Sequence, residues 1–138
     1  MLMDESLLDT DTLSEILKGK NANVIAKSQQ YLSKHNQFAF SAMTYYEVLR
    51  GIQAKQATRQ IANFPQLTAS AAVIPISISV LQRAASLWVF ALSSGHSRDD
   101  ADLIIAATAL ELGRVLVTGN TPHFKWVPGL RIEDWRWP

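Results

Sequence analysis

The chain of 138 residues contains 13 lysines and arginines, 12 aspartates and glutamates, and no cysteine. This length is typical of one domain, and a content of 48% apolar and 18% charged residues excludes a disordered or fibrous chain. The absence of cysteine excludes disulfides, thiolate metal sites and cysteine nucleophiles. The net charge of +1 does not indicate a nucleic-acid-binding protein, but the charge is unevenly distributed, because residues 48–98 contain five basic residues and no acid.

The first third of the chain predicts an alternation of short strands and helices. Apolar periodicity, polar caps and glycine stops give a strand over 6–9, a helix over 10–18, a helix over 21–35, a strand over 37–41 and a helix from 42 to about 50. The first strand ends at an acidic residue, and the second strand is followed by a helix with another acid one turn from its start.

The rest of the chain continues this pattern. We predict a helix over 58–67 that closes near Pro65, and a long helix from Ser77 or Ser79 to Ser94 in which Trp88 packs in the core. The other predicted elements are a strand over 72–76, a helix from Asp99 or Asp100 to Leu110, a strand over 114–118 and an edge strand over 130–132. Alternating strands and helices predict an α/β fold, with a mostly parallel sheet covered by helices on both faces.

The chain shows no targeting or membrane signal. Its first residues are acidic and lack the apolar core of a secretory signal, and no stretch approaches 18 consecutive apolar residues. We therefore expect a cytoplasmic protein with no membrane partner.

Three acids are candidates for chemistry because of their positions. Asp9 ends the first strand, Glu47 follows the second strand by one turn, and Asp102 lies in the first turn of a late helix. Parallel sheets place their sites at the carboxyl ends of their strands, so these acids can meet there. Converging carboxylates need a cation such as Mg²⁺ or Mn²⁺, which can activate water and stabilise a phosphodiester transition state.

The same acids also fit ordinary structural roles. Each one can cap a helix, interact with a helix dipole or lie on a solvated helix face. However, all three are embedded in apolar sequence, where a charge is costly unless it is paired or bound to a metal.

Four segments resemble the motifs of the PIN-domain family, specifically of its VapC-type toxin ribonucleases. The resemblance covers Leu7 to Trp135, and the motifs occur in the family's order. The segments are 7–13 (LLDTDTL), 41–51 (SAMTYYEVLRG), 100–109 (DADLIIAATA) and 117–130, which contains VTGNTPHF and VPGL.

This resemblance implies a single three-layer α/β/α PIN domain over residues 1–138. It also implies a metal-dependent endoribonuclease that hydrolyses RNA phosphodiesters as the toxin of a type II toxin–antitoxin pair. Asp9, Glu47 and Asp102 match the family's acidic ligands, which hold one or two Mg²⁺ or Mn²⁺ ions. The implied protein partners are a second copy of the chain, forming a homodimer, and a cognate antitoxin whose peptide covers the cleft.

Several further residues are assigned by their place in these motifs. Asp11 stands where the family usually has asparagine, and Asn120 stands where many members have a fourth acid. Asn120 would bind a metal ion through a water molecule or orient a phosphate. Asp11 and Asp100 would contact the metal ligands rather than the metal ion. Thr10 and Thr118 would orient carboxylates or bind phosphate, unless they are ordinary cap and turn hydroxyls.

Two other functions keep this fold. One is a PIN-domain nuclease of RNA processing or repair without an antitoxin, and the other is a non-catalytic binding module. His123 lies in the last loop near Asn120, where it either reaches the substrate or, as we favour, has a structural role. The bases of residues 48–98 either rim the cleft and contact RNA phosphates or are ordinary surface charges.

Overall fold

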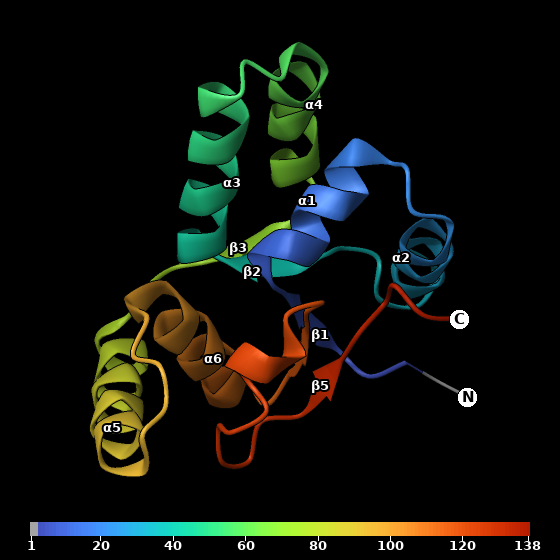
Figure 1. Cartoon of the computed structure of the whole chain (residues 1–138). Coiled ribbons are helices and arrows are strands. Elements are labelled where there is room, and N and C mark those ends of the chain that lie inside the picture. Colours follow the sequence, from blue (N-terminus) through green and yellow to red (C-terminus); the bar gives the residue numbers. More distant parts are fainter. Residues whose placement is uncertain (1–2) are drawn as a thin grey trace.

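The computed structural model describes residues 3–138 and contains helices on both sides of short strands (Figure 1). The helices are α1 (Thr10–Lys18), α2 (Ala22–His35), α3 (Ala42–Ala54), α4 (Thr58–Ala69), α5 (Ile78–Ser94), α6 (Asp100–Leu112) and the short 3₁₀ helix η1 (Thr121–His123). The strands are β1 (Ser6–Leu8), β2 (Ala39–Ser41), β3 (Ala72–Ile74), β4 (Val115–Val117) and β5 (Ile132–Glu133).

All strand pairs are parallel. Strand β4 lies between β1 and β5, and β2 pairs with β3. Since β1 also lies beside β2, the spatial order of the strands is β3-β2-β1-β4-β5. The order in which the strands are added to the sheet reverses between β1 and β4, and an open α/β sheet forms its site at such a point. The predicted parallel α/β fold is confirmed.

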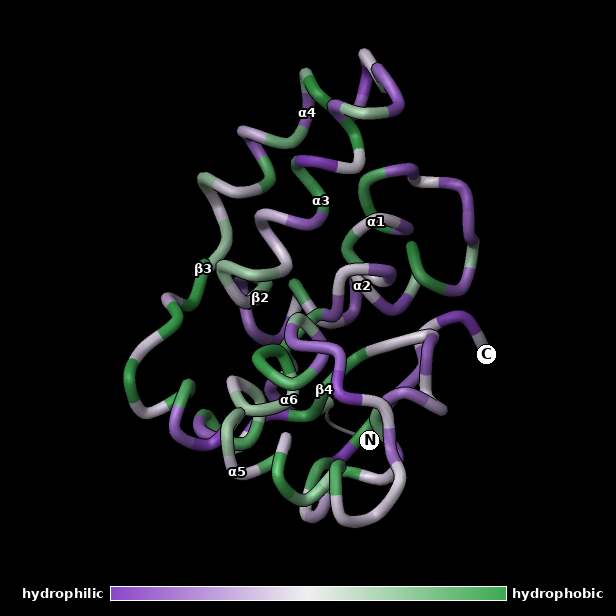
Figure 2. Tube along the Cα trace, turned by 60° about the vertical axis from the view of Figure 1, so that its left-hand side comes forward, coloured by the Kyte–Doolittle hydropathy of each residue, from purple (hydrophilic) through white to green (hydrophobic). Residues whose placement is uncertain are grey.

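Successive side chains along each strand pack against helical layers on opposite faces of the sheet. Leu7 and Leu116 pack in a cluster with α5 and α6, whereas Leu8 and Val117 pack in a second cluster with α1 to α4. This alternation follows from the two-residue period of a strand. Figure 2 shows hydrophobic residues gathered around β4 and α6. The sheet is therefore the middle of three layers, and its carboxyl edge lies between the two helical layers.

Local sequence explains where most helices begin and end. Side chains of Asn21, Ser77 and Asp99 accept hydrogen bonds from the first turns of α2, α5 and α6. Gly95 and Gly113 end α5 and α6 with positive φ angles of 74° and 63°, which favour glycine.

The prediction that helix α4 closes near Pro65 was wrong. The helix continues to Ala69 with Pro65 inside it. Proline removes the hydrogen bond to the carbonyl of Ile61, but Ile61 is 39% exposed, so water can reach that side of the helix. Phe64, the residue before the proline, anchors this part of the helix, because it is buried and stacks on Tyr45 with 5.3 Å between ring centroids.

The prediction that Trp88 packs in the core was also wrong. Trp88 is 39% exposed, and the buried face of α5 consists of Val80, Ala84, Leu87 and Ala91. One face of α5 packs on α6, so the apolar residues on its other faces remain at the surface. Within residues 3–138, no helix combines the length and the apolar content needed to cross a membrane.

Candidate functional site

Asp9 is a buried carboxylate at the carboxyl end of β1. Its Oδ1 accepts a hydrogen bond from the Thr10 amide at 2.8 Å, and its Oδ2 accepts one from the Thr118 hydroxyl at 2.8 Å. Burial, together with the charges of Asp11 and Asp102, raises its pKa to about 7, although the two hydrogen bonds oppose this shift. A carboxyl group with such a pKa near neutral pH is typical of functional sites.

Glu47 reaches the same edge of the sheet from helix α3. The Thr10 hydroxyl donates a hydrogen bond to Glu47 Oε1 at 2.6 Å, and Arg50 Nη2 lies 3.6 Å from Glu47 Oε2. Thr10 Oγ1 is also 3.3 Å from the buried Thr44 hydroxyl. The first turns of α1 and α3 therefore hold the Glu47 carboxylate at the end of β1.

Asp102 comes from the opposite helical layer, at the start of α6. Its amide donates to the side chain of Asp99, the helix cap, at 3.0 Å. Its Oδ2 lies 2.9 Å from His123 Nδ1, in the loop after β4. Burial raises the pKa of Asp102, as do the charges of Asp99 and Glu47, while the contact with His123 opposes the shift.

Hydrogen bonds join Asp9 to Glu47 on one side and to the loop after β4 on the other, and His123 of that loop contacts Asp102. Thr10 joins Asp9 to Glu47 through its amide and its hydroxyl. On the other side, Thr118 contacts Asp9 and accepts a hydrogen bond from the amide of Asn120 at 2.9 Å. The Asn120 side chain lies 2.9 Å from His123 Nδ1, which contacts Asp102. The hydroxyls of Thr10 and Thr118 thus orient carboxylates, one of the two roles considered for them.

Asp11 lies beside Asp9 and binds the loop that follows β4. Its Oδ2 accepts a hydrogen bond from the Gly119 amide at 2.9 Å. A Cβ atom at Gly119 would lie 2.8 Å from the same oxygen, so a larger residue there would displace the Asp11 carboxylate. The extra carboxylate therefore belongs to the site and raises the pKa of Asp9.

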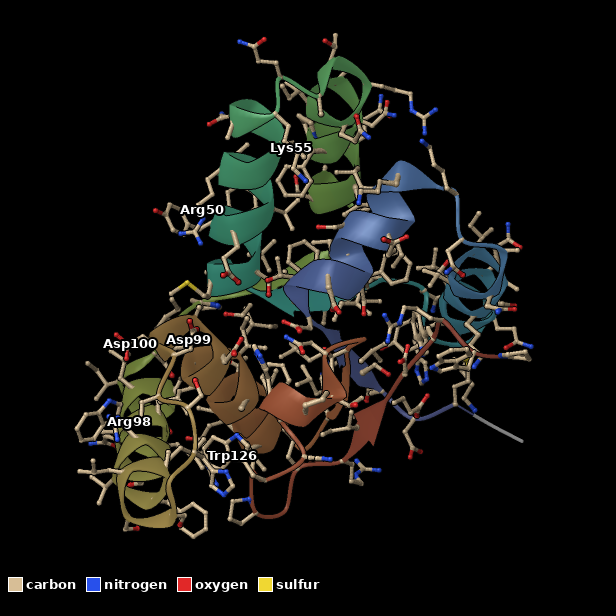
Figure 3. The ribbon with its side chains drawn as sticks, in the orientation of Figure 1. Arg50, Lys55, Arg98, Asp99, Asp100 and Trp126 are labelled. Atoms are coloured by element: carbon tan, nitrogen blue, oxygen red, sulfur yellow. The ribbon has the colours of Figure 1, made fainter. Side chains whose placement is uncertain are left out.

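The structure does not place Asp100 with these acids. Asp100 lines a groove with Leu81, Trp88 and Leu103, on the side of α6 that faces α5. Residues two apart on a helix point about 200° apart, which separates Asp100 from Asp102. Figure 3 shows Asp99 and Asp100 together at the start of α6, and it is Asp99 that contacts Asp102. The prediction that Asp100 supports Asp102 does not fit this placement.

The donor set has the chemistry that a hard divalent cation requires. Asp9, Glu47 and Asp102 supply carboxylate oxygens, and burial together with neighbouring negative charges raises the pKa of Asp9 and of Asp102. Within the described part of the chain, no three histidine, aspartate or glutamate side chains are arranged to hold an ion together. Glu47 is turned toward Thr10, and Asp102 toward His123.

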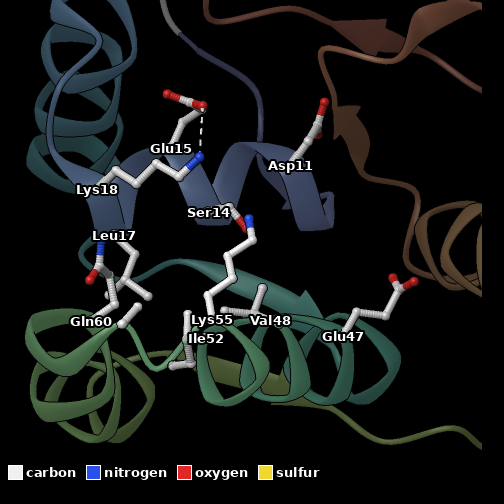
Figure 4. A pocket seen from close by; sticks show the side chains of 12 residues that line it. Asp11, Ser14, Glu15, Leu17, Lys18, Glu47, Val48, Ile52, Lys55 and Gln60 are labelled. Carbon is white, nitrogen blue, oxygen red and sulfur yellow. Dashed lines mark ion pairs between the residues drawn. The ribbon is translucent and has the colours of Figure 1, made fainter.

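A groove adjoins the acids between α1, α3 and the start of α4. Figure 4 shows its apolar floor of Leu17, Val48 and Ile52, with Asp11 and Glu47 at the end near the acids. The cavity has a volume of about 290 Å³. Lys55 extends into it from α3, and Figure 3 shows this lysine between α3 and α4. The groove therefore adjoins the acid site at Asp11 and Glu47.

Two residues beside the acids were not predicted as site residues. The contact of His123 with Asp102 depends on the fold of the loop after β4, although its position three residues after Asn120 is a weak signal. Arg136 donates to the Gly119 carbonyl at 2.7 Å. It lies 17 residues further along the chain, and no motif points to it.

Comparison with known proteins agrees with this architecture. The family model described as PIN domain matches residues 6–128. The chain is 26% identical to ribonuclease VapC1 of Haemophilus influenzae (strain R2866) over 136 residues, which covers 94% of this chain and 96% of the relative. It is 25% identical to the tRNA(fMet)-specific endonuclease VapC of Shigella flexneri over 130 residues, with the same coverage of both chains.

Solved structures give the same result. The chain is similar to the structure of DNA-bound VapBC from Salmonella typhimurium, with a TM-score of 0.84, 25% identity, and coverage of 96% of this chain and 99% of that one. Its similarity to VapBC-1 from nontypeable Haemophilus influenzae has a TM-score of 0.80 at 25% identity, covering 96% of this chain and 98% of that one. The motifs, the three-layer fold and the match over residues 6–128 show that this chain belongs to the PIN domain family.

Proposed function

We propose that this protein is a metal-dependent endoribonuclease and the toxin of a toxin–antitoxin pair. The observation that carries the proposal is the network of contacts around Asp9, Glu47 and Asp102 at the carboxyl edge of the sheet. The relatives named ribonuclease and endonuclease support the reaction class.

The proposed chemistry assigns a role to each part of the network. Asp9, Glu47 and Asp102 would hold Mg²⁺ or Mn²⁺, which supplies an activated water and stabilises the charge that develops on the phosphate. Because Glu47 and Asp102 are bonded to Thr10 and His123, the ion would compete with these partners for the carboxylates. Thr118 would keep Asp9 in place when its charge is neutralised.

An RNA cleavage assay with matched variants tests this proposal. We expect the purified protein to cleave single-stranded RNA with Mg²⁺ and not with EDTA, and Asp102→Asn to be at least 100-fold slower, since it removes a charged ligand. Asp100→Asn is the control, because it makes the same charge change two residues away on the other side of α6. Cleavage that persists in EDTA, or equal loss in both variants, would contradict the proposed metal site.

The antitoxin is part of the same proposal. The similar solved structures are of VapBC complexes, and the groove between α1 and α3 adjoins the acids through Asp11 and Glu47. We expect the product of a small neighbouring open reading frame to copurify with this chain and to inhibit cleavage. If this product neither binds nor inhibits, the favoured function becomes that of a PIN-domain nuclease of RNA processing without an antitoxin.

We also propose that the protein forms a homodimer. Ile78, Val89 and Leu92 lie on one face of α5 and are between 51% and 71% exposed, which gives an apolar surface outside the acid site. Light scattering after size exclusion should give a mass of two chains for the native protein and of one chain for Val89→Glu. A native mass of one chain would rule out the homodimer.

A further inference from the structure

The C-terminal segment after β5 places Arg136 next to the acidic residues. Arg136 Nη2 donates a hydrogen bond to the Gly119 carbonyl at 2.7 Å. A Cβ atom built on Gly119 would lie 2.7 Å from Arg136 Cζ and 2.8 Å from Asp11 Oδ2. The guanidinium and the Asp11 carboxylate therefore lie over the same backbone atom, on the loop that also contacts Asp9 through Thr118.

The guanidinium is fixed before any ligand arrives. Asp134 accepts hydrogen bonds from Arg136 Nε at 3.1 Å and from Nη2 at 2.9 Å, and the Asp134 side chain is only 14% exposed. Arg136 itself is 45% exposed, and within residues 3–138 no hydrogen bond reaches its Nη1. Nε and Nη2 are thus held by Asp134 and Gly119, and the two N–H groups of Nη1 remain to donate to a phosphate.

The electrostatics of the site favour a cation at this position. Asp9, Asp11, Glu47 and Asp102 gather in one place, and an RNA phosphate adds further negative charge. The pKa of Arg136 is raised, mainly because it donates to Asp134, and the charges of Asp11 and Glu15 add to the effect. Asp11 and Glu15 therefore act on this guanidinium from α1, next to the acid site.

We propose that Arg136 binds a phosphate of the RNA substrate at the edge of the acid site, through the Nη1 group of its guanidinium. This inference rests on the proposed nuclease function. It assigns substrate binding to the C-terminal segment, outside the residues 6–128 that match the family model.

Arg131 provides a matched control within the same chain. Its Nη1 pairs with Asp4 at 2.9 Å and its Nη2 donates to the Gly113 carbonyl at 3.1 Å, so it contacts an aspartate and a glycine carbonyl as Arg136 does. Gly113 precedes β4 whereas Gly119 follows it, so the two arginines lie at opposite ends of the strand. Arg131 is therefore away from the carboxyl edge.

Salt-dependent RNA binding tests the inference. The affinity for a fluorescent single-stranded RNA is measured with Mg²⁺ in the Asp102→Asn background, over a series of KCl concentrations. Adding Arg136→Gln should weaken binding about tenfold and reduce the slope of log K against log salt by about 0.7, the value for one phosphate contact on a single strand. Arg131→Gln should change neither quantity, and Arg136→Lys should restore the slope because it keeps the charge.

Several results would overturn the inference while leaving the nuclease function intact. They are an unchanged slope and affinity in Arg136→Gln, an equal loss in Arg131→Gln, or a loss of antitoxin binding alone. Thermal unfolding of each variant identifies loss of folding, and if Arg136→Gln does not fold, a second neutral variant, Arg136→Met, is measured against Arg136→Lys: a slope equal in the two would overturn the inference. By contrast, a native protein that neither binds nor cleaves RNA would refute the proposed function itself.

Discussion

Replacing Asp9 with asparagine should make the metal-free protein more stable at alkaline pH while abolishing cleavage. Asparagine has nearly the same shape, and its carbonyl oxygen can accept the hydrogen bond of the Thr10 amide. The hydroxyl of Thr118 can then turn to accept from the new amide group instead of donating. The substitution thus removes a buried charge and leaves the hydrogen bonds satisfied.

The size of the effect follows from the pKa of Asp9, which burial raises from 3.8 to about 7. Below about pH 4 the group is protonated in both states, and between about pH 4 and 7 it ionises only in the unfolded chain, so the stability of the native protein falls as the pH rises. At pH 8 the raised pKa of Asp9 lowers the free energy of unfolding by about 4 kcal/mol, and about 3 kcal/mol of this loss develops between pH 5 and pH 8. Asp9→Asn escapes this cost.

Urea denaturation of both proteins in EDTA at several pH values measures this difference. The free energy of unfolding of Asp9→Asn should exceed that of the native protein at pH 8, and the gap should shrink toward pH 5. Groups that do not interact with Asp9 are common to both proteins and cancel, whereas Asp11 and Asp102 lose the repulsion of Asp9, which adds to the gap at high pH. Equal stability at pH 8, or a gap that does not depend on pH, would refute the assignment of a buried, charged Asp9.

Three further substitutions test the groups that hold the site and the sheet. Thr118→Val removes the hydroxyl donor to Asp9, so the pKa of Asp9 should rise further, which a carboxyl NMR titration in EDTA would measure. Thr10→Val removes the 2.6 Å hydrogen bond to Glu47 and should lower kcat about tenfold in the RNA cleavage assay, while Thr10→Ser keeps the hydroxyl and the rate. Tyr31→Phe leaves a buried β1 amide without its acceptor and should cost about 1–3 kcal/mol in urea denaturation.

Much of the fold could be predicted from the sequence because the local signals agree with one another. The strand-and-helix alternation, the caps at Asn21 and Ser77 and the stop at Gly95 predict elements that the structure contains. The elements in turn predict a parallel sheet, and a parallel sheet brings acids at strand ends together. For this reason Asp9, after β1, and Glu47, one turn after β2, could be placed at one edge although they are far apart in the chain.

The errors arise where tertiary contacts decide the result. Apolar periodicity cannot tell which side of α5 meets α6, and so Trp88 was assigned to the core although it lies at the surface, with the Arg98 guanidinium 5.3 Å from its ring. Pro65 is a helix breaker in isolation, but the packing of Phe64 keeps α4 continuous. The contacts of His123 and Arg136 with the site depend on the paths of the loop after β4 and of the C-terminal segment, which no local pattern specifies.

The uneven charge distribution takes on a more specific meaning in the structure. Of the five bases in residues 48–98, four contact their own chain: Arg50 pairs with Glu47, Arg59 donates to the Lys18 carbonyl, Arg83 pairs with Glu111 and Arg98 covers Trp88. Lys55 instead extends into the groove beside the acids (Figure 4).

Lys55 and Arg136 therefore lie on either side of the carboxylates. Asp11 lines the groove with Lys55 and also lies over Gly119 next to Arg136. An RNA strand whose phosphates contact both cations would have to pass over Asp11, close to Asp9. Because a single net charge of +1 averages these opposed groups, it conceals a local order of cation, carboxylates and cation that suits a polyanion bound across the proposed metal site.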